Sequence, residues 1–253
     1  MSRETARVLG ARVAVLVGAL LLWEVIAAPL NPLLYVRPSA LPPALANVLL
    51  ARDVPPLGEH ALVTFREIVA AFLLAAAVGL WLGFVLGVGR WLGRVYEPML
   101  GAFYAIPSVI WYPSLMLFFG LGPASKIAFG FLLAFFPICL SVLSGIRQVN
   151  PHLVTVARSM GAGCWTVFRK VMLPSMLGTL MGGLRAGLAL SVVGVLVGEM
   201  LGARSGLGYL LNYTYGLLMT REYAALVVLI AVGVLALDGL AALLEARGRR
   251  WSG

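Results

Sequence analysis

The chain has 253 residues, of which 61% are hydrophobic and 11% are charged. A soluble domain of this length would carry about 25% charged residues, so the composition argues against a soluble fold and favours an integral membrane protein built of helices. The formal net charge is +9, but the arginines lie at the ends of apolar runs and form no basic strip with interleaved aromatic residues. This distribution argues against a nucleic-acid partner.

The first apolar run, residues 13–30, follows three arginines and is long enough to cross a bilayer. A cleaved signal peptide would show the same positive start, but the length favours an uncleaved span. Residues 31–59 are rich in proline, which precludes a continuous helix, and residues 44–52 can form a short amphipathic helix on the outer surface. We therefore predict an N-terminal helix-and-linker domain, residues 1–60, ahead of a five-helix core over residues 61–253.

Five further apolar runs are predicted to span the membrane. They cover residues 60–88, 98–122, 127–146, 176–201 and 223–244. With the first run they predict an all-α, polytopic membrane protein with six transmembrane helices. The fifth of the six spans carries a run of small residues that permits close helix packing, namely Gly178, Gly182, Gly183 and Gly187.

The predicted span at residues 98–122 contains Pro107 and Pro113 together with Tyr104 and Tyr112. Prolines within a span free backbone carbonyls that need partners or water. The pattern therefore fits the wall of a solute pathway, or equally a kinked helix packed against its neighbours. The arginines that precede this span, Arg90 and Arg94, are predicted to form an inner loop.

Three charged residues fall within the last two predicted spans. A charge at the centre of a span costs about 3 kcal/mol on insertion scales, so it usually faces the bundle interior or water. Arg185 could attract an anion in the pathway or pair with Asp238, and we favour the pair. Glu199, near the outer end of the fifth span, could hold the outer loop closed, and Ser191 is a further candidate for the pathway.

Residues 150–174 form the longest polar-flanked segment in the chain and predict two short helices separated by a glycine break. Asn150 is a plausible N-cap, followed by Pro151 at the first helical position. One helical face is apolar: Leu153, Val156, Ala157 and Met160. The segment offers an apolar stripe, a basic flank and a fixed bend, which suits docking into a groove on a soluble partner. An ordinary loop that covers the membrane surface would show the same pattern.

The segment resembles the cytoplasmic signature loop of binding-protein-dependent ABC importer permeases. Gly161, Val171 and the pair Leu173-Pro174 keep the spacing of that signature, whereas its Glu-Ala-Ala positions fall on Thr155, Val156 and Ala157, of which only Ala157 matches. Three further motifs resemble the nitrate, sulfonate and taurine group of these permeases. They are YEPML at residues 96–100, LGPASKIA at 121–128 and SGLGYL at 205–210.

The resemblance implies a pair of permease subunits, two cytoplasmic ATPase subunits that hold ATP and Mg, and an extracytoplasmic solute-binding protein. It implies import of a small solute by alternating access, with a small anion such as nitrate, a sulfonate or taurine as the first candidate and heterocyclic vitamins as another. The implied ATPase-coupling residues are Thr155, Val156, Ala157, Arg158, Gly161, Ala162, Gly163, Trp165, Phe168, Arg169, Leu173 and Pro174. Two alternatives stay open: a secondary transporter driven by an ion gradient, and a non-transporting membrane scaffold.

Charge distribution predicts the orientation. Six spans place both termini and residues 150–174 on one side of the membrane, and that side collects about two-thirds of the lysines and arginines, which makes it cytoplasmic. We therefore expect a multi-pass protein of the cell membrane with both termini in the cytoplasm. The chain contains no P-loop, no zinc-ligand spacing and no disulfide framework, so we expect no catalytic site, metal or bound cofactor on it.

Overall fold

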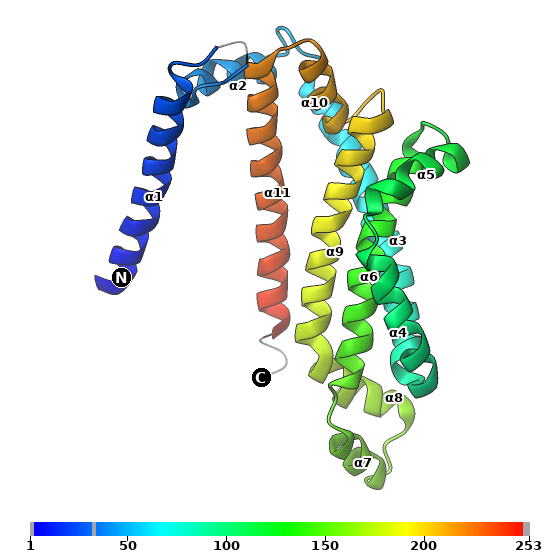
Figure 1. The fold of residues 1–253 in the computed structure, drawn as a ribbon. Coiled ribbons are helices and arrows are strands. Elements are labelled where there is room, and N and C mark those ends of the chain that lie inside the picture. Colours follow the sequence, from blue (N-terminus) through cyan, green and yellow to red (C-terminus); the bar gives the residue numbers. More distant parts are fainter. Residues whose placement is uncertain (1–2, 32–33, 250–253) are drawn as a thin grey trace. The chain divides into compact units, whose positions relative to one another are not determined.

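The computed structural model describes residues 3–31 and 34–249, in which helices are the only regular elements (Figure 1). In chain order the elements are α1 (Arg3–Ala27), the 3₁₀ turn η1 (Pro38–Ala40), α2 (Leu41–Leu49), α3 (Leu57–Val88), α4 (Arg90–Ala105), the 3₁₀ turn η2 (Ser108–Trp111), α5 (Tyr112–Phe119), α6 (Pro123–Arg147), α7 (Pro151–Ser159), α8 (Cys164–Val167), the π-helical turn η3 (Phe168–Met172), α9 (Leu173–Gly202), α10 (Leu207–Gly216) and α11 (Thr220–Arg249).

The chain divides into two compact units. One unit contains residues 1–60 and 210–231. The other, which we call the core unit, contains residues 61–209 and 232–253. In the first unit, Glu24 near the end of α1 accepts hydrogen bonds from the backbone N–H and the hydroxyl of Ser39, at 3.0 and 2.8 Å, so this charged residue is satisfied at the end of the apolar run.

Five helical segments in the described part of the chain are long and apolar enough to cross a membrane. They are Gly10–Ala27, Leu57–Val88, Pro123–Arg147, Cys164–Gly202 and Thr220–Leu243. A sixth crossing exists if the bent pair Trp91–Ala105 and Ser108–Phe119 counts as one broken span. The prediction of an all-α polytopic membrane protein is confirmed. The predicted amphipathic helix is present as α2, which begins three residues before the predicted start because Pro42 and Pro43 are tolerated in a first helical turn.

The span predicted over residues 98–122, with a kink as one interpretation of its prolines, is present as a bent pair of helical segments. The helical axis bends by 86° between α4 and η2. Ile106, which precedes Pro107, adopts an extended conformation with φ −68° and ψ 132° because the ring of a proline disfavours the α region for the residue before it. The prediction of a loop at Arg90 and Arg94 is wrong, since both residues belong to α4 and only Gly89 separates that helix from α3.

In the core unit, α6 and α9 run side by side, with α7 and α8 at one end and α5 at the other (Figure 1). Their backbones meet where two glycines face each other: a Cβ added at Gly194 would lie 2.7 Å from the Cα of Gly130. Of the four glycines predicted to permit close packing, Gly183 and Gly187 also face α6, whereas Gly178 and Gly182 have open space where a Cβ would be. The fully buried apolar residues Ala71, Ala134 and Ile138 fill the spaces around this contact.

We expect the substitution Gly194→Val to destabilise the protein by about 1–3 kcal/mol, because the new side chain would push the backbones of α6 and α9 apart. The matched control is Gly182→Val on the same helix, where the added atoms meet open space. Thermal unfolding of the two purified variants in detergent measures the difference. Equal melting temperatures would show that the α6–α9 contact tolerates a larger separation.

Candidate functional site

Residues 150–174 fold into α7, a turn, α8 and the π-helical turn that leads into α9. Asn150 caps α7 as the sequence predicts: its Oδ1 accepts a hydrogen bond from the N–H of His152 at 2.9 Å. The predicted glycine break is also present. Gly161 has φ +79°, a conformation that side-chain-bearing residues rarely adopt, and its N–H donates to the carbonyl of Arg158 at 2.9 Å.

The sequence predicts a kink or a boundary at Pro174, where a proline precedes the apolar run of residues 176–201, but the chain does not break there. The helix continues from Cys164 to Gly202, and a π-helical turn at Phe168–Met172 takes the place of the predicted boundary. Proline has no N–H to donate to the preceding turn. The next residue, Ser175, donates its hydroxyl to the carbonyl of Val171 at 2.6 Å. Residues 164–172 are therefore continuous with the long helix α9.

Large apolar side chains are exposed on one face of α7 and on α8. The exposed fractions are 51% for Leu153, 58% for Val156, 82% for Met160 and 71% for Trp165. The first three lie on one helical face, with Ala157 half-buried between them. Patches of this kind, next to a polar surface, mark sites of protein–protein contact.

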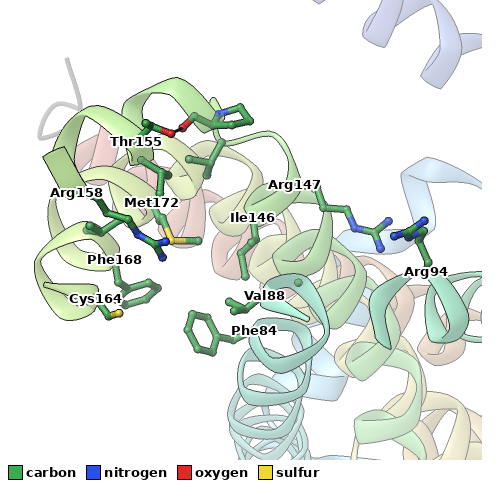
Figure 2. A pocket seen from close by; sticks show the side chains of 15 residues that line it. Phe84, Val88, Arg94, Ile146, Arg147, Thr155, Arg158, Cys164, Phe168 and Met172 are labelled. Atoms are coloured by element: carbon green, nitrogen blue, oxygen red, sulfur yellow. Dashed lines mark hydrogen bonds between the residues drawn. The ribbon is translucent and has the colours of Figure 1, made fainter. Parts of the chain in front are cut away.

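The opposite face of α7 lines a cavity of about 720 Å³ (Figure 2). At about 100° per residue, the cavity-lining residues of α7 lie on the side of the helix away from the exposed apolar face. These cavity-lining residues are Pro151, Val154, Thr155 and Arg158. The other walls come from the ends of α3 and α6, from α4 and from residues 164–172. Thr155 and Arg158, both predicted to couple to an ATPase, therefore face this cavity.

Some of the remaining predicted coupling residues are exposed and the others are half-buried. Gly161, Gly163, Trp165 and Arg169 are exposed, whereas Ala162, Leu173 and Pro174 are half-buried. Phe168 is half-buried and lies edge-on to Phe84 of α3, with ring centroids 5.1 Å apart, so it ties the segment to the rest of the core unit.

The five predicted pathway residues do not converge on the cavity of Figure 2, since none of them lines it. Tyr112 is fully buried, and its hydroxyl donates to the carbonyl of Gly198 at 2.6 Å, which makes it a packing residue. Tyr104 is exposed at 45%, and Ser191 is buried with its hydroxyl bonded to the carbonyl of Leu188 at 2.8 Å.

Arg185 of α9 and Asp238 of α11 are brought together in a bidentate ion pair. The Nε of Arg185 lies 2.6 Å from Oδ1 of Asp238, and Nη2 lies 2.5 Å from Oδ2. Both side chains are about 40% exposed, and both belong to helical segments that are long and apolar enough to cross a membrane. The pair neutralises the one arginine of α9 in this conformation.

We expect the single substitution Asp238→Ala to lower the amount of protein in the membrane more than the double substitution Arg185→Ala with Asp238→Ala. The single variant leaves an uncompensated arginine inside a span, whereas the double variant removes both charges. Quantitative immunoblotting of membrane fractions measures the difference, with Arg185→Asp plus Asp238→Arg as the charge-swapped control. If the single variant accumulates as well as the double variant, the pair has no role in assembly.

Glu199 is the centre of a buried polar cluster. The sequence predicts only that Glu199 could hold the outer loop, and not its other partners. Its carboxylate accepts from the hydroxyl of Thr64 at 2.7 and 3.0 Å and from the N–H of Gly208 at 2.7 Å. The N–H of Leu207 donates to the hydroxyl of Thr64 at 2.7 Å. Residues 207–208 are thereby fastened to α3 and α9, and the exposed fraction of Glu199 is 1%.

Two further charged residues, Glu67 and Lys126, are buried in the core unit at 3% exposure each. The Nζ of Lys126 donates to the carbonyls of Leu121 and Gly122 at 3.0 and 3.1 Å. Sequence reasoning missed this burial because both residues stand near the ends of apolar runs, where charged residues are usually exposed. Helical spacing could have predicted it, because a charged residue on the apolar face of its helix is a candidate for burial beside a polar partner.

A family model described as "Binding-protein-dependent transport system inner membrane component" matches residues 75–250. A putative ABC transporter permease protein of Methanocaldococcus jannaschii is 31% identical over 228 residues, which cover 87% of this chain and 84% of that protein. The riboflavin transport system permease protein RibX of Chloroflexus aurantiacus is 38% identical over 162 residues, which cover 64% and 60%. The taurine transport system permease protein TauC of Escherichia coli is 27% identical over 198 residues, which cover 78% and 72%.

Among solved structures, an inward-facing conformation of the MetNI methionine ABC transporter contains a similar chain. The TM-score is 0.62 at 23% sequence identity, and the match covers 76% of this chain and 94% of the other. At this identity the likeness concerns the fold.

Proposed function

The chain belongs to the family of binding-protein-dependent transport system inner membrane components, and from that membership we propose that it carries a small solute into the cytoplasm at the expense of ATP hydrolysed on separate subunits. It is an ABC importer permease and an integral inner membrane protein with several crossings. We also propose a docking surface for the ATPase, an orientation in the membrane, a subunit assembly and a cargo for this permease.

The observation that carries the proposal is the exposed apolar face of α7 and α8. Leu153, Val156, Met160 and Trp165 are each more than half exposed on a short helical segment between two long apolar helices. Exposure of this much apolar surface is costly in water and is relieved when a partner covers it. We propose that a cytoplasmic ABC ATPase subunit, which binds ATP and Mg, accepts this face in a groove.

The continuity between the docking segment, residues 150–172, and α9 supports the proposal of alternating access. The helix runs without a break from Cys164 to Gly202, so a displacement of α8 by the ATPase would move α9 as a rigid element. The same helix holds Arg185 against Asp238 and, at its other end, holds residues 207–208 through Glu199. Movement of the docking segment is thus proposed to reach both the ion pair and the outer loop.

The proposed orientation places both termini and residues 150–174 in the cytoplasm, on the charge distribution given above. The assembly is proposed to contain a second permease subunit, most simply another copy of this chain, and an extracytoplasmic solute-binding protein. For the cargo, a small anion such as nitrate, a sulfonate or taurine is the first candidate, in keeping with the taurine permease among the relatives. The riboflavin permease supports a heterocyclic solute as the second candidate.

The native cysteines provide the test of orientation and docking, because Cys164 is exposed in the docking segment and Cys139 is buried in α6. We expect a membrane-impermeant maleimide to label Cys164 in inverted membrane vesicles and not in intact cells. Assembly with the ATPase should slow the labelling of a cysteine placed at Met160 in the Cys164→Ser background, because Met160 is 82% exposed on the face that the partner would cover. The variant Cys164→Ser, which retains only the buried Cys139, is the control. Labelling from the outside of intact cells would overturn the proposal.

Uptake into proteoliposomes separates the proposal from the two alternatives. We expect solute uptake to require the ATPase, ATP and the binding protein, and to persist when ion gradients are collapsed. Uptake by this chain alone under an ion gradient would indicate a secondary transporter. The solute that co-purifies with the partner binding protein, identified by mass spectrometry, decides between a small anion and a heterocycle.

A further inference from the structure

The cavity beneath α7 carries an excess of positive charge that docking to an ATPase does not explain. Arg94, Arg147 and Arg158 line it, and its lining includes no aspartate or glutamate. Arg147 also pairs with Glu97, which does not line the cavity. The three arginines come from three different helices, with Arg94 and Arg147 together at one edge of the cavity and Arg158 at another (Figure 2). Arginine in such clusters favours phosphate, because its planar fork of donors matches the geometry of phosphate oxygens.

The rest of the cavity wall is apolar. Phe84 and Val88 of α3, Ile146 of α6, and Phe168 and Met172 surround the space between the arginines (Figure 2). A small hydrated anion would gain nothing from this wall. A ligand with an anionic head and a hydrocarbon chain would satisfy both kinds of surface at once.

The position of the cavity agrees with such a ligand. The apolar run of α3 ends at Val88, and Trp81 and Val88 are exposed at 66% and 54% on that helix, as expected for a surface that faces lipid. Trp91 follows at 71% exposure in the first turn of α4. Tryptophan is enriched where membrane meets water. The cavity therefore lies at the depth of lipid headgroups, with Phe84 and Val88 leading from it along α3.

We propose that this cavity binds the phosphate headgroup of an anionic phospholipid, with an acyl chain along Phe84 and Val88. Basic pockets beside membrane helices on the cytoplasmic side hold such headgroups. The bound lipid would connect Arg158 of the docking segment to Arg94 and Arg147 on the membrane helices. Binding and docking do not compete, because Arg158 lies on the face of α7 opposite to Val156 and Met160. The inference rests on the proposed cytoplasmic orientation of residues 150–174 but does not require ATPase docking.

The test is native mass spectrometry of the purified full chain, delipidated and titrated with phosphatidylglycerol or with phosphatidylcholine of the same acyl composition. We expect one phosphatidylglycerol to bind per chain, and to bind more tightly than phosphatidylcholine. The expected preference is about fivefold for each arginine that contacts the headgroup, because a charge near a membrane surface contributes about 1 kcal/mol. Arg158→Gln should weaken phosphatidylglycerol binding by about that factor. The side chain of Arg158 is exposed and has no hydrogen-bond or ion-pair partner in the described part of the chain, so Arg158→Gln should leave the fold intact.

Lys170→Gln is the matched control, because Lys170 lies exposed in the same segment and does not line the cavity. It should leave the preference for phosphatidylglycerol unchanged. Equal binding of the two lipids, or an equal loss in both variants, would overturn the proposal. Competition by soluble glycerol phosphate at the affinity of the whole lipid would assign the cavity to a free phosphate compound instead. Release of the lipid on addition of the ATPase would show that an acidic segment of that partner occupies the cavity.

Discussion

Replacing Gly206 with alanine is expected to destabilise the protein by about 2–5 kcal/mol, the sum of a strained backbone conformation and a steric clash in a buried site. Gly206 has φ +107°, where a side-chain-bearing residue is strained. A Cβ built on this glycine would overlap the carboxylate of Glu199, which is buried and cannot move away without losing its hydrogen bonds. Thermal unfolding in detergent measures the loss.

Two other glycines separate the two contributions. Gly120 has φ +76° and ψ −176°, with open space where a Cβ would be, so Gly120→Ala reports conformational strain alone, about 1–3 kcal/mol. Gly122 has a negative φ and open space, so Gly122→Ala should have little effect. If Gly206→Ala costs no more than Gly120→Ala, the Glu199 carboxylate yields to the new methyl group and the proposed rigidity of this cluster is wrong.

A double-mutant cycle tests whether Glu199 is the obstacle. Glu199→Ala removes the acceptor for the hydroxyl of Thr64 and for the N–H of Gly208, and the loss of these buried hydrogen bonds is itself destabilising. In the double variant with Gly206→Ala the clash is absent, so the combined loss should be smaller than the sum of the two single losses. Additive losses would place the cost of Gly206→Ala elsewhere. Uptake assays on the variants then show whether release of residues 207–208 also impairs transport.

The sequence predicts the helices of this protein well, because long apolar runs have few alternatives in a bilayer. Its failures are local and have a common cause. At Pro107 the chain bends by 86°, whereas at Pro137 the helix α6 continues without a break. A proline frees backbone groups in both places, and the surrounding helices decide whether those groups are satisfied in a straight or a bent chain. That decision depends on neighbours that are distant in the sequence.

The candidate site divides in the same way. The N-cap at Asn150 and the turn at Gly161 depend on residues close in the chain, and both are predictable. The apolar face of α7 is also readable from helical spacing, but the cavity on its opposite face is not. The cavity forms where the ends of α3 and α6 lie beside Arg158 of α7, and these three helices come together only in the folded protein. The cluster around Glu199 likewise joins Thr64 to Gly208 across 144 residue positions.

The largest functional effect is expected from Gly161→Pro, which should abolish association with the ATPase while the protein remains in the membrane. The ring of proline fixes φ near −65°, far from the +79° of Gly161, and the substitution also removes the N–H that donates to Arg158. The turn between α7 and α8 would have to change, and the exposed face of α7 would lose its orientation toward Trp165. Co-purification of the ATPase through a tag on this chain measures the effect.

Gly163→Pro is the matched control, because Gly163 has φ −69° and ψ 165°, a conformation that proline adopts readily, with open space around it. This variant should retain the ATPase. Trp165→Asp tests the docking surface without altering the backbone: it places a charge on a side chain that is 71% exposed and should also abolish association, whereas Trp165→Phe should weaken it only slightly. Together the four variants separate the shape of the turn from the chemistry of the surface. Recovery of intact complex with both Gly161→Pro and Trp165→Asp would mean that the ATPase binds elsewhere.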